Sequence, residues 1–293
     1  MDDAGQGVLR RSIGERIFLW RANRGRGCVM LSYQHIYHAG NLADVQKHAL
    51  LAWMLAYLTR KDKPLSYIET HAGRGVYELQ APEALKTGEA AAGISRVLEN
   101  HGLGEDHPLS RAIDACRERF GETSYPGSPL VAAALLREMD SLHFAELHPQ
   151  EYAALRQALR PWHAKVHQQD GFELALSLAP PTPRRGLMLI DPSFEIKSDY
   201  ARIPGIIGKL HRKWNVGVIA LWYPILTDGA HQKMLSALET QALPGALRHE
   251  VRFPPVRAGH RMVGSGMFVV NAPFGAEEEA ARISALFERL NQD

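Results

Sequence analysis

The chain has 293 residues, of which 45% are hydrophobic and 23% are charged, which is the composition of an ordinary globular protein and excludes a disordered or fibrous one. Two cysteines, Cys28 and Cys116, are too few for a disulfide framework, and no apolar run reaches the roughly 20 residues of a membrane-spanning helix. The net charge of +2 is uneven: residues 1–29 hold six arginines and three acids (+3), which leaves about −1 for the rest. We therefore expect a cytoplasmic protein, monomeric, whose near-neutral body does not by itself indicate nucleic-acid binding.

Residues 1–29 differ from the rest of the chain because they are rich in glycine and arginine, with one short apolar patch at 17–20. Such a composition cannot bury enough apolar surface to fold. We predict a disordered upstream extension over 1–29 and a folded domain over 30–293, with Met30 as the natural start. An RNA-binding arm is the alternative for the extension.

The first predicted elements are a helix and a strand. The helix begins near Asn41, a plausible cap with Asp44 in the first turn, and ends at Lys63-Pro64. A short strand over 65–69 then leads into a glycine turn. The Ala-rich residues that follow are helical in pattern and too many for a standard crossover, so we place a helical insertion at about 80–123.

The remaining elements alternate between helices and strands. They begin with a glycine turn at 124–129, a helix at 131–140, and strands at 143–147 and 164–171 around a helix at 150–160. A strand over GLMLIDPSF at 186–194, a helix near 199–213, a strand at 216–224 and an antiparallel pair at 247–253 and 266–273 follow. This alternation predicts an α/β fold with a largely parallel sheet. Ligands of such sheets bind at the carboxyl ends of the strands, so the loops after Glu69, Leu147 and Ile190 are the candidate site.

Three of the candidate motifs are weak when each is taken alone. The turn ETHAGRG at 69–75 has two glycines but lacks the third glycine of a dinucleotide fingerprint, which disfavours a dinucleotide oxidoreductase. Glu146 ends a strand where an acid commonly holds ribose hydroxyls, and Asp170-Gly171 is positioned to meet an adenine. A structural turn, an exposed carboxylate and an ordinary Asp-Gly turn are the respective alternatives.

The stretch IDPSFE at 190–195 is the most specific motif. The exocyclic amine of adenine is a poor nucleophile, so its methylation requires acceptors for its two hydrogens and a methyl donor held in line. Asp191 and the carbonyl of Pro192 can be the acceptors, and Phe194 can stack on the base. A plain Asp-Pro turn at the end of a strand is the alternative interpretation.

Seven motifs in one order resemble a known family: HAGNLADVQKH (38–48), ETHAGRG (69–75), YPGSP (125–129), ELHP (146–149), DGF (170–172), LIDPSFE (189–195) and ALWYP (220–224). They are similar to those of the bacterial 23S ribosomal RNA adenine-N(6) methyltransferases of the RlmJ type, over about 30–275. The resemblance implies a class I methyltransferase fold, a Rossmann-like seven-stranded sheet with an inserted helical subdomain, and S-adenosylmethionine (SAM) as methyl donor.

The same resemblance implies roles for individual residues. The positions expected to contact SAM are Lys47, His48, His71, Gly73, Ser128, Glu146, Asp170 and Gly171. Asp191 matches the catalytic acid, next to Pro192 and Phe194 whose roles follow from the loop chemistry above, and Tyr33 matches a position that touches the substrate. A packed helical histidine at 48 and a helix cap at Ser128 are the structural alternatives. The family pattern is Pro-Pro-Tyr where this chain has Pro192-Ser193-Phe194, which keeps the stacking face and loses backbone rigidity.

The expected function is methyl transfer from SAM to N(6) of one adenine in 23S rRNA, without a metal. The alternatives are a DNA adenine-N(6) methyltransferase and a weakly catalytic SAM- and RNA-binding protein. The basic residues expected to contact the RNA backbone are Arg184, Arg185, Lys209, Arg212, Lys213, Arg257 and Arg261.

Overall fold

The computed structural model describes residues 34–100, 102–255 and 259–292. The chain consists of two compact units, Met1–Gln34 and His35–Asp293, and all the described residues except Gln34 belong to the second. The predictions for residues 1–29, Met30 and Tyr33 concern residues outside the described part. Among the described residues, no helix combines the length and the apolar character needed to cross a membrane.

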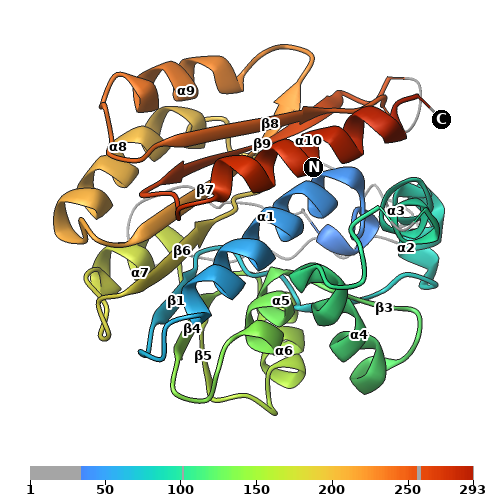
Figure 1. Ribbon diagram of the computed structural model, residues 1–293, viewed down its shortest axis with the longest axis horizontal. Helices are drawn as coiled ribbons and strands as arrows, with labels where there is room; N and C mark the ends of the chain where they lie inside the picture. The colour runs from blue at the N-terminus through green and yellow to red at the C-terminus, as the bar shows by residue number, and fades with distance from the viewer. Residues whose placement is uncertain (1–33, 101, 256–258, 293) are drawn as a thin grey trace, which may run out of the picture. The chain divides into compact units, whose positions relative to one another are not determined.

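A seven-stranded sheet forms the centre of the second unit, in the order β5-β4-β1-β6-β7-β9-β8 (Figure 1). Strand β9 runs opposite to the other six strands of this sheet. The strands are β1 (Ser66–Glu69), β4 (Ser141–Ala145), β5 (Ala164–His167), β6 (Gly186–Ile190), β7 (Val218–Leu226), β8 (Leu247–Arg252) and β9 (Met262–Val270). The predicted largely parallel α/β sheet and its closing antiparallel pair are confirmed.

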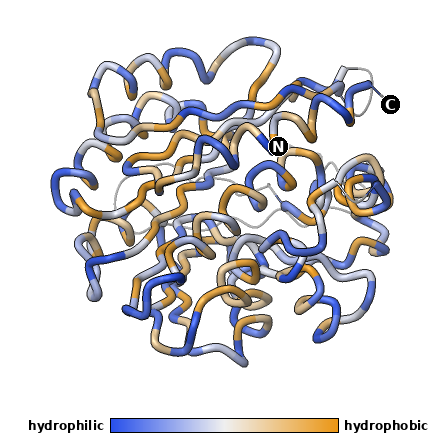
Figure 2. Tube along the Cα trace, in the orientation of Figure 1, coloured by the Kyte–Doolittle hydropathy of each residue, from blue (hydrophilic) through white to orange (hydrophobic). Residues whose placement is uncertain are grey.

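Helices cover both faces of the sheet because successive residues of a buried strand point to opposite sides. Tyr67 and Leu189 pack on one side with α1, α4, α5 and α10, while Ile68 and Ile190 pack on the other with α7, α8 and α9. These helices are α1 (Leu42–Thr59), α4 (Pro108–Phe120), α5 (Ser128–Leu135), α6 (Pro149–Ala158) beside β5, α7 (Gly171–Leu178), α8 (Asp199–Lys213), α9 (His231–Glu239) and α10 (Ala276–Leu290). Figure 2 shows the hydrophobic residues along the central strands and the hydrophilic ones on the surrounding loops.

Helix α1 forms for the reasons read from the sequence. Asn41 is its N-cap and accepts from the Asp44 N–H at 2.9 Å, which satisfies one of the free donors of the first turn. The helix ends at Thr59, four residues before the predicted Lys63-Pro64 stop. Most of its surface is buried because it lies between β9, α5 and α10, so even its polar residues near the N-terminus are inaccessible to water.

A second, small sheet is formed by the two segments that precede and follow the helices of residues 82–120 in the sequence. Strands β2 (Val76–Glu78) and β3 (Ser124–Pro126) pair antiparallel. Between them lie α2 (Pro82–Thr87), a π-helical turn η2 (Ala91–Ser95), α3 (Arg96–Glu99) and α4, while the short helix η1 (His35–Tyr37) precedes α1. The predicted glycine turn at 124–129 is wrong, because its first three residues pair as β3 and the helix expected from 131 begins at Ser128.

Candidate active site

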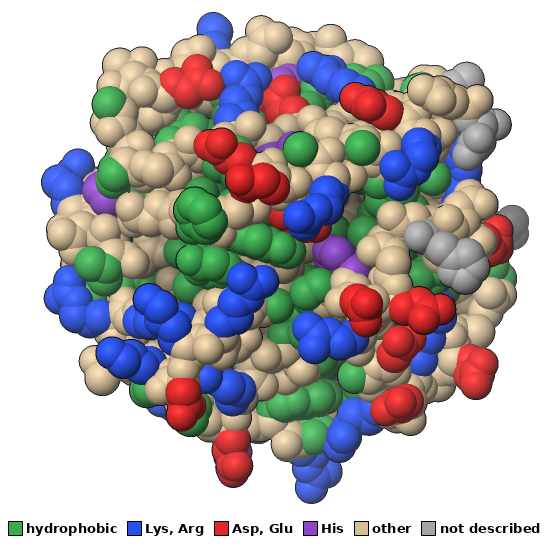
Figure 3. Space-filling model, in the orientation of Figure 1, with side chains coloured by type: hydrophobic (Ala, Val, Ile, Leu, Met, Phe, Trp, Pro, Cys, Tyr) green, Lys and Arg blue, Asp and Glu red, His purple; other side chains and the backbone are tan. Residues whose placement is uncertain are grey.

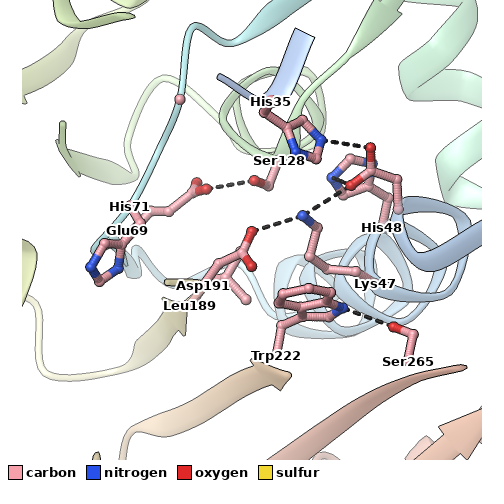
Figure 4. A network of polar contacts seen from close by, with 12 residues as sticks. His35, Lys47, His48, Glu69, His71, Ser128, Leu189, Asp191, Trp222 and Ser265 are labelled. Atoms are coloured by element: carbon pink, nitrogen blue, oxygen red, sulfur yellow. Dashed lines mark hydrogen bonds and ion pairs between the residues drawn. The ribbon is translucent and has the colours of Figure 1, made fainter. Parts of the chain in front are cut away.

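Parallel strands bring three sequence-distant loops to one edge of the sheet. The loops after β1, β4 and β6 all leave at this carboxyl edge, where Asp191 of the loop after β6 meets Lys47 of α1 (Figure 4). Register sets the central pair: Ile190 is opposite Leu221, so the next residues, Asp191 and Trp222, stand level with each other and point toward α1.

The contact between Lys47 and Asp191 is the main electrostatic feature of this edge. Lys47 Nζ lies 2.7 Å from Asp191 Oδ2 and 3.1 Å from Asp44 Oδ1, and the Lys47 side chain is only 6% exposed. Burial lowers the pKa of Lys47, but the attraction of Asp191 and Asp44 outweighs it and raises the pKa above its usual value. Lys47 therefore remains charged and compensates both carboxylates.

Asp44 anchors the segment that precedes α1. Its Oδ2 contacts His35 Nε2 at 2.8 Å and accepts from the Gly40 N–H at 2.9 Å. Burial raises the pKa of Asp44, yet His35 and Lys47 together hold it well below its ordinary value. Neither Asp44 nor His35 was predicted as a site residue; an acid three positions before Lys47, on the same side of a helix, was the available signal.

A buried carboxyl group lies at the end of β1. Glu69 Oε1 accepts from Ser128 Oγ at 2.5 Å and Oε2 accepts from Tyr67 Oη at 2.9 Å. Burial raises the pKa of Glu69 to about 8 despite these two bonds, with Asp191 adding repulsion. The interpretation of Ser128 as a helix cap is wrong, because Gly127 occupies the cap position and the Ser128 hydroxyl bonds Glu69.

Glu146 joins two of the loops. Its Oε2 accepts from the Gly73 N–H at 2.8 Å, and its Oε1 accepts from the His148 N–H at 2.7 Å. Burial raises its pKa to about 7, above the usual range of a carboxyl group. Gly73 has φ of +63°, which only glycine adopts readily, so the turn after β1 requires this residue.

The residues expected around an adenine lie at the start of α7. Asp170 caps this helix through its Oδ1, which accepts from the Glu173 N–H at 3.0 Å. At Gly171 the backbone passes so close to Thr70 that a Cβ would be 1.7 Å from the Thr70 carbonyl oxygen. His71 packs edge-on against Phe172, and burial lowers its pKa to about 4.

The loop after β6 carries the predicted stacking ring. Phe194 has φ of +56° and is 7% exposed, with its ring centroid 4.6 Å from that of Tyr200 and 6.2 Å from that of Trp222. Pro192 is buried and Ser193 exposed. The Phe194 ring is thus packed between two aromatic residues, and stacking on a base, which stays a prediction, requires this packing to open.

His48 lies one residue beyond Lys47 and faces the small sheet. Its Nδ1 is 2.9 Å from Tyr125 Oη, and burial lowers its pKa to about 3, so the ring is neutral. Among the described residues, its Nε2 has no hydrogen-bond partner. The packed-histidine alternative thus describes its surroundings, while its predicted contact with the donor remains a prediction.

Comparisons with known proteins identify the family. The family model described as "Ribosomal RNA large subunit methyltransferase D, RlmJ" matches residues 62–292. Ribosomal RNA large subunit methyltransferase J of Escherichia coli is 39% identical over 85% of this chain and 90% of that protein. The protein of the same name from Haemophilus influenzae is 36% identical over 87% of this chain and 92% of its own. This chain belongs to that family.

The RlmJ-family assignment agrees with the fold. A crystal structure of a Legionella pneumophila protein is 35% identical, with a TM-score of 0.76 over 86% of this chain and 92% of that one. The predicted recognition and the class I methyltransferase fold are confirmed, and the protein is a methyltransferase of the family that acts on large-subunit ribosomal RNA.

Most of the basic residues expected to contact RNA lie away from this site. Arg184 and Arg185 precede β6 and so lie at the amino edge of the sheet, with Arg185 bonded to the carbonyls of Leu58 and Lys63. Residues 209–213 end α8, which returns to the same amino edge. Figure 3 shows lysines and arginines on the side where β1 begins in Figure 1. Arg261 pairs with Asp228 beyond the end of β7, and Arg257 is outside the described residues.

Proposed function

We propose that this protein transfers a methyl group from SAM to the N(6) amine of one adenine in 23S ribosomal RNA. The observation that carries the proposal is Asp191, a carboxylate level with Trp222 at the carboxyl edge and paired with the buried Lys47 at 2.7 Å. An Asp-Pro loop ending a central strand supplies the two acceptors that the amine requires. Family membership supports ribosomal RNA as the polymer.

Asp191 would act on the amine through its free oxygen. Lys47 engages Oδ2, and among the described residues no group forms a hydrogen bond with Oδ1. Oδ1 would accept one hydrogen of the amine and the Pro192 carbonyl the other, which draws the nitrogen toward tetrahedral geometry. The positive charge of Lys47 compensates the negative charge of Asp191 in this largely buried place. The proton lost by the nitrogen would pass to Asp191 or to water.

The residues around the first glycine turn fit SAM. Glu146 is a buried carboxyl group that can accept from ribose hydroxyls, and the absence of a side chain at Gly73 and Gly171 lets backbone come close to a ligand. His71, Asp170 and Phe172 lie at the neighbouring turn, where an adenine ring would be held. Lys47, His48 and Ser128 lie on the α1 side of this turn. When bound, SAM supplies an electrophilic methyl group to the amine.

Methylation of unmodified 23S rRNA with labelled SAM tests the proposal. Asp191→Ala should lose the label, because an unassisted amine reacts slowly. Asp62→Ala, which changes a side chain that is 94% exposed, is the matched control and should label like wild type. Equal label with Asp191→Ala would end the catalytic assignment. A parallel assay on DNA separates the two polymers, and preferential labelling of DNA would replace rRNA as the substrate.

Ser193 is the feature that favours a weakly catalytic binding protein instead. It is exposed, and the Glu195 N–H reaches its Oγ only at 3.5 Å, so little fixes the backbone at this point. Proline at position 193 would restrict that freedom. Ser193→Pro raising turnover by orders of magnitude would support the binding protein, whereas a change of less than about threefold, or 0.7 kcal/mol, would support a working site.

A further inference from the structure

A line of hydrogen bonds connects the active-site edge to α10 through the protein interior. Trp222 Nε1–H donates to Ser265 Oγ at 2.8 Å, and the Ser265 hydroxyl donates to Gln46 Oε1 at 2.9 Å (Figure 4 shows the first bond). Gln46 Nε2 lies 3.0 Å from His249 Nδ1, and His249 Nε2 lies 3.1 Å from Ser284 Oγ. The strand members share the sheet face that packs against α1.

Each link of this line can join one hydrogen-bond donor to one acceptor. An amide nitrogen only donates, so His249 Nδ1 must accept and the proton of the neutral ring must be on Nε2, which then donates to Ser284. Burial lowers the pKa of His249 to about 4, so the ring is in the required neutral form near pH 7. Ser265 and Gln46 are 0% exposed, so any broken link leaves a buried polar atom without a partner.

The ring of Trp222 connects the line to Lys47 and Phe194. Lys47 Nζ lies 5.4 Å from the centroid of its ring, which is cation–π distance, and the Phe194 ring lies 6.2 Å away. Lys47 in turn holds Asp191. A rotation of the indole would therefore move the support of Lys47 and, through it, the direction of the Asp191 carboxylate.

We propose that Ser265, Gln46 and His249 are positioning residues that hold the Trp222 indole as the platform of Lys47, and so fix where Asp191 points. The inference rests on the proposed catalytic role of Asp191. It predicts a selective effect on turnover, because small misplacements of a catalytic group lower the rate more than they lower binding.

Ser265→Ala tests the role of this line of hydrogen bonds, with Ser66→Ala as its matched control. Both serines are 0% exposed, but Ser66 donates to the Pro183 carbonyl at the amino edge of the sheet, 2.8 Å away. We expect kcat to fall about tenfold or more in Ser265→Ala, with the KM for SAM changed less than about threefold. Gln46→Leu removes the acceptor of the Ser265 proton while it fills similar space, and should lower kcat in the same way.

The Trp222 indole gives a readout that a general loss of stability would not reproduce. Its N–H signal is assigned among the five tryptophans by its absence in Trp222→Phe, and it should exchange with solvent faster in Ser265→Ala than in Ser66→Ala. Because phenylalanine has no N–H, the Ser265→Ala/Trp222→Phe double variant should turn over no more slowly than Trp222→Phe alone.

Two results would overturn the proposed role of this line of hydrogen bonds. One is a turnover of Ser265→Ala equal to that of Ser66→Ala, and the other is a double variant in which the losses of turnover from Ser265→Ala and Trp222→Phe multiply. Asp191→Ala, measured in parallel, separates the two proposals. If Asp191→Ala is inactive while Ser265→Ala is unaffected, only the proposal for the line of hydrogen bonds fails. If it labels rRNA like wild type, the catalytic assignment fails.

Discussion

Lys47→Met should destabilise the fold by about 3 kcal/mol near pH 7, toward the low end of the range of about 3–5 kcal/mol for breaking a buried ion pair. At an effective dielectric constant of about 20, the contacts of Lys47 Nζ at 2.7 Å with Asp191 and 3.1 Å with Asp44 correspond to about 6 and 5 kcal/mol of attraction. Desolvation of the ammonium offsets several kcal/mol of this. Asp44 keeps its bonds with His35 and the Gly40 N–H, and Asp191, 12% exposed, reaches water.

The pH dependence of this loss has a definite sign. The pKa of Asp44 is lower in the folded protein than its ordinary 3.8, so its contribution to stability is full above 3.8 and is lost as the pH falls through the folded value. The difference between wild type and Lys47→Met should therefore narrow below pH of about 4. Urea denaturation between pH 3 and 8 measures both the loss of stability at pH 7 and its change with pH, when wild type and variant are fitted with one common dependence of the unfolding free energy on urea concentration.

An exposed ion pair provides the control for this experiment. Arg261 pairs with Asp228, and the two side chains are 59% and 45% exposed, so Arg261→Met should cost less than about 1 kcal/mol. A loss below about 1 kcal/mol for Lys47→Met at pH 7, or a difference that persists unchanged to pH 3, would refute the assignment of Lys47 as the buried counter-ion.

Two further predictions concern Glu69 and the close approach at Gly171. Glu69 has a folded pKa of about 8 against an ordinary 4.5, so its ionisation opposes folding increasingly as the pH rises between these values. Glu69→Gln should then match wild type in urea denaturation at pH 4.5 and exceed it at pH 9; equal stability at pH 9 would contradict the raised pKa. Gly171→Ala should destabilise by more than about 3 kcal/mol, because its Cβ would meet the Thr70 oxygen at 1.7 Å and overpacked backbone has no room to move. Gly205→Ala, on α8 with nothing within 4 Å, should instead stabilise by about 0.5–1 kcal/mol. A stabilising Gly171→Ala or a destabilising Gly205→Ala in thermal unfolding would contradict the geometry.

The order of the main elements could be predicted from local sequence because its causes are local. Asn41 caps the helix that it precedes, and runs such as 186–190 are apolar on both faces because helices cover both sides of the sheet. The motifs at strand ends, above all Asp191-Pro192, also follow from local sequence, since parallel strands always deliver their carboxyl ends to one edge. The predicted turn at 124–129 was wrong because residues 124–126 pair with the distant strand β2, and the helix predicted to stop at Lys63-Pro64 ends already at Thr59.

Only the tertiary structure decided which side chains meet. Lys47 reaches Asp191 across 144 positions, and Gln46 reaches His249 across 203, separations at which sequence spacing carries no geometric information. Ser128 could be read as a cap until Glu69 was found beside it, and a sum of charges could not place Arg184 and Arg185 at the edge opposite the site. The sequence by itself determined the family and the order of the main helices and strands along the chain, and it predicted the chemistry of the loop after β6. Tertiary packing decided the partners of its carboxylate, because desolvation and ion pairing depend on distances that no local pattern encodes.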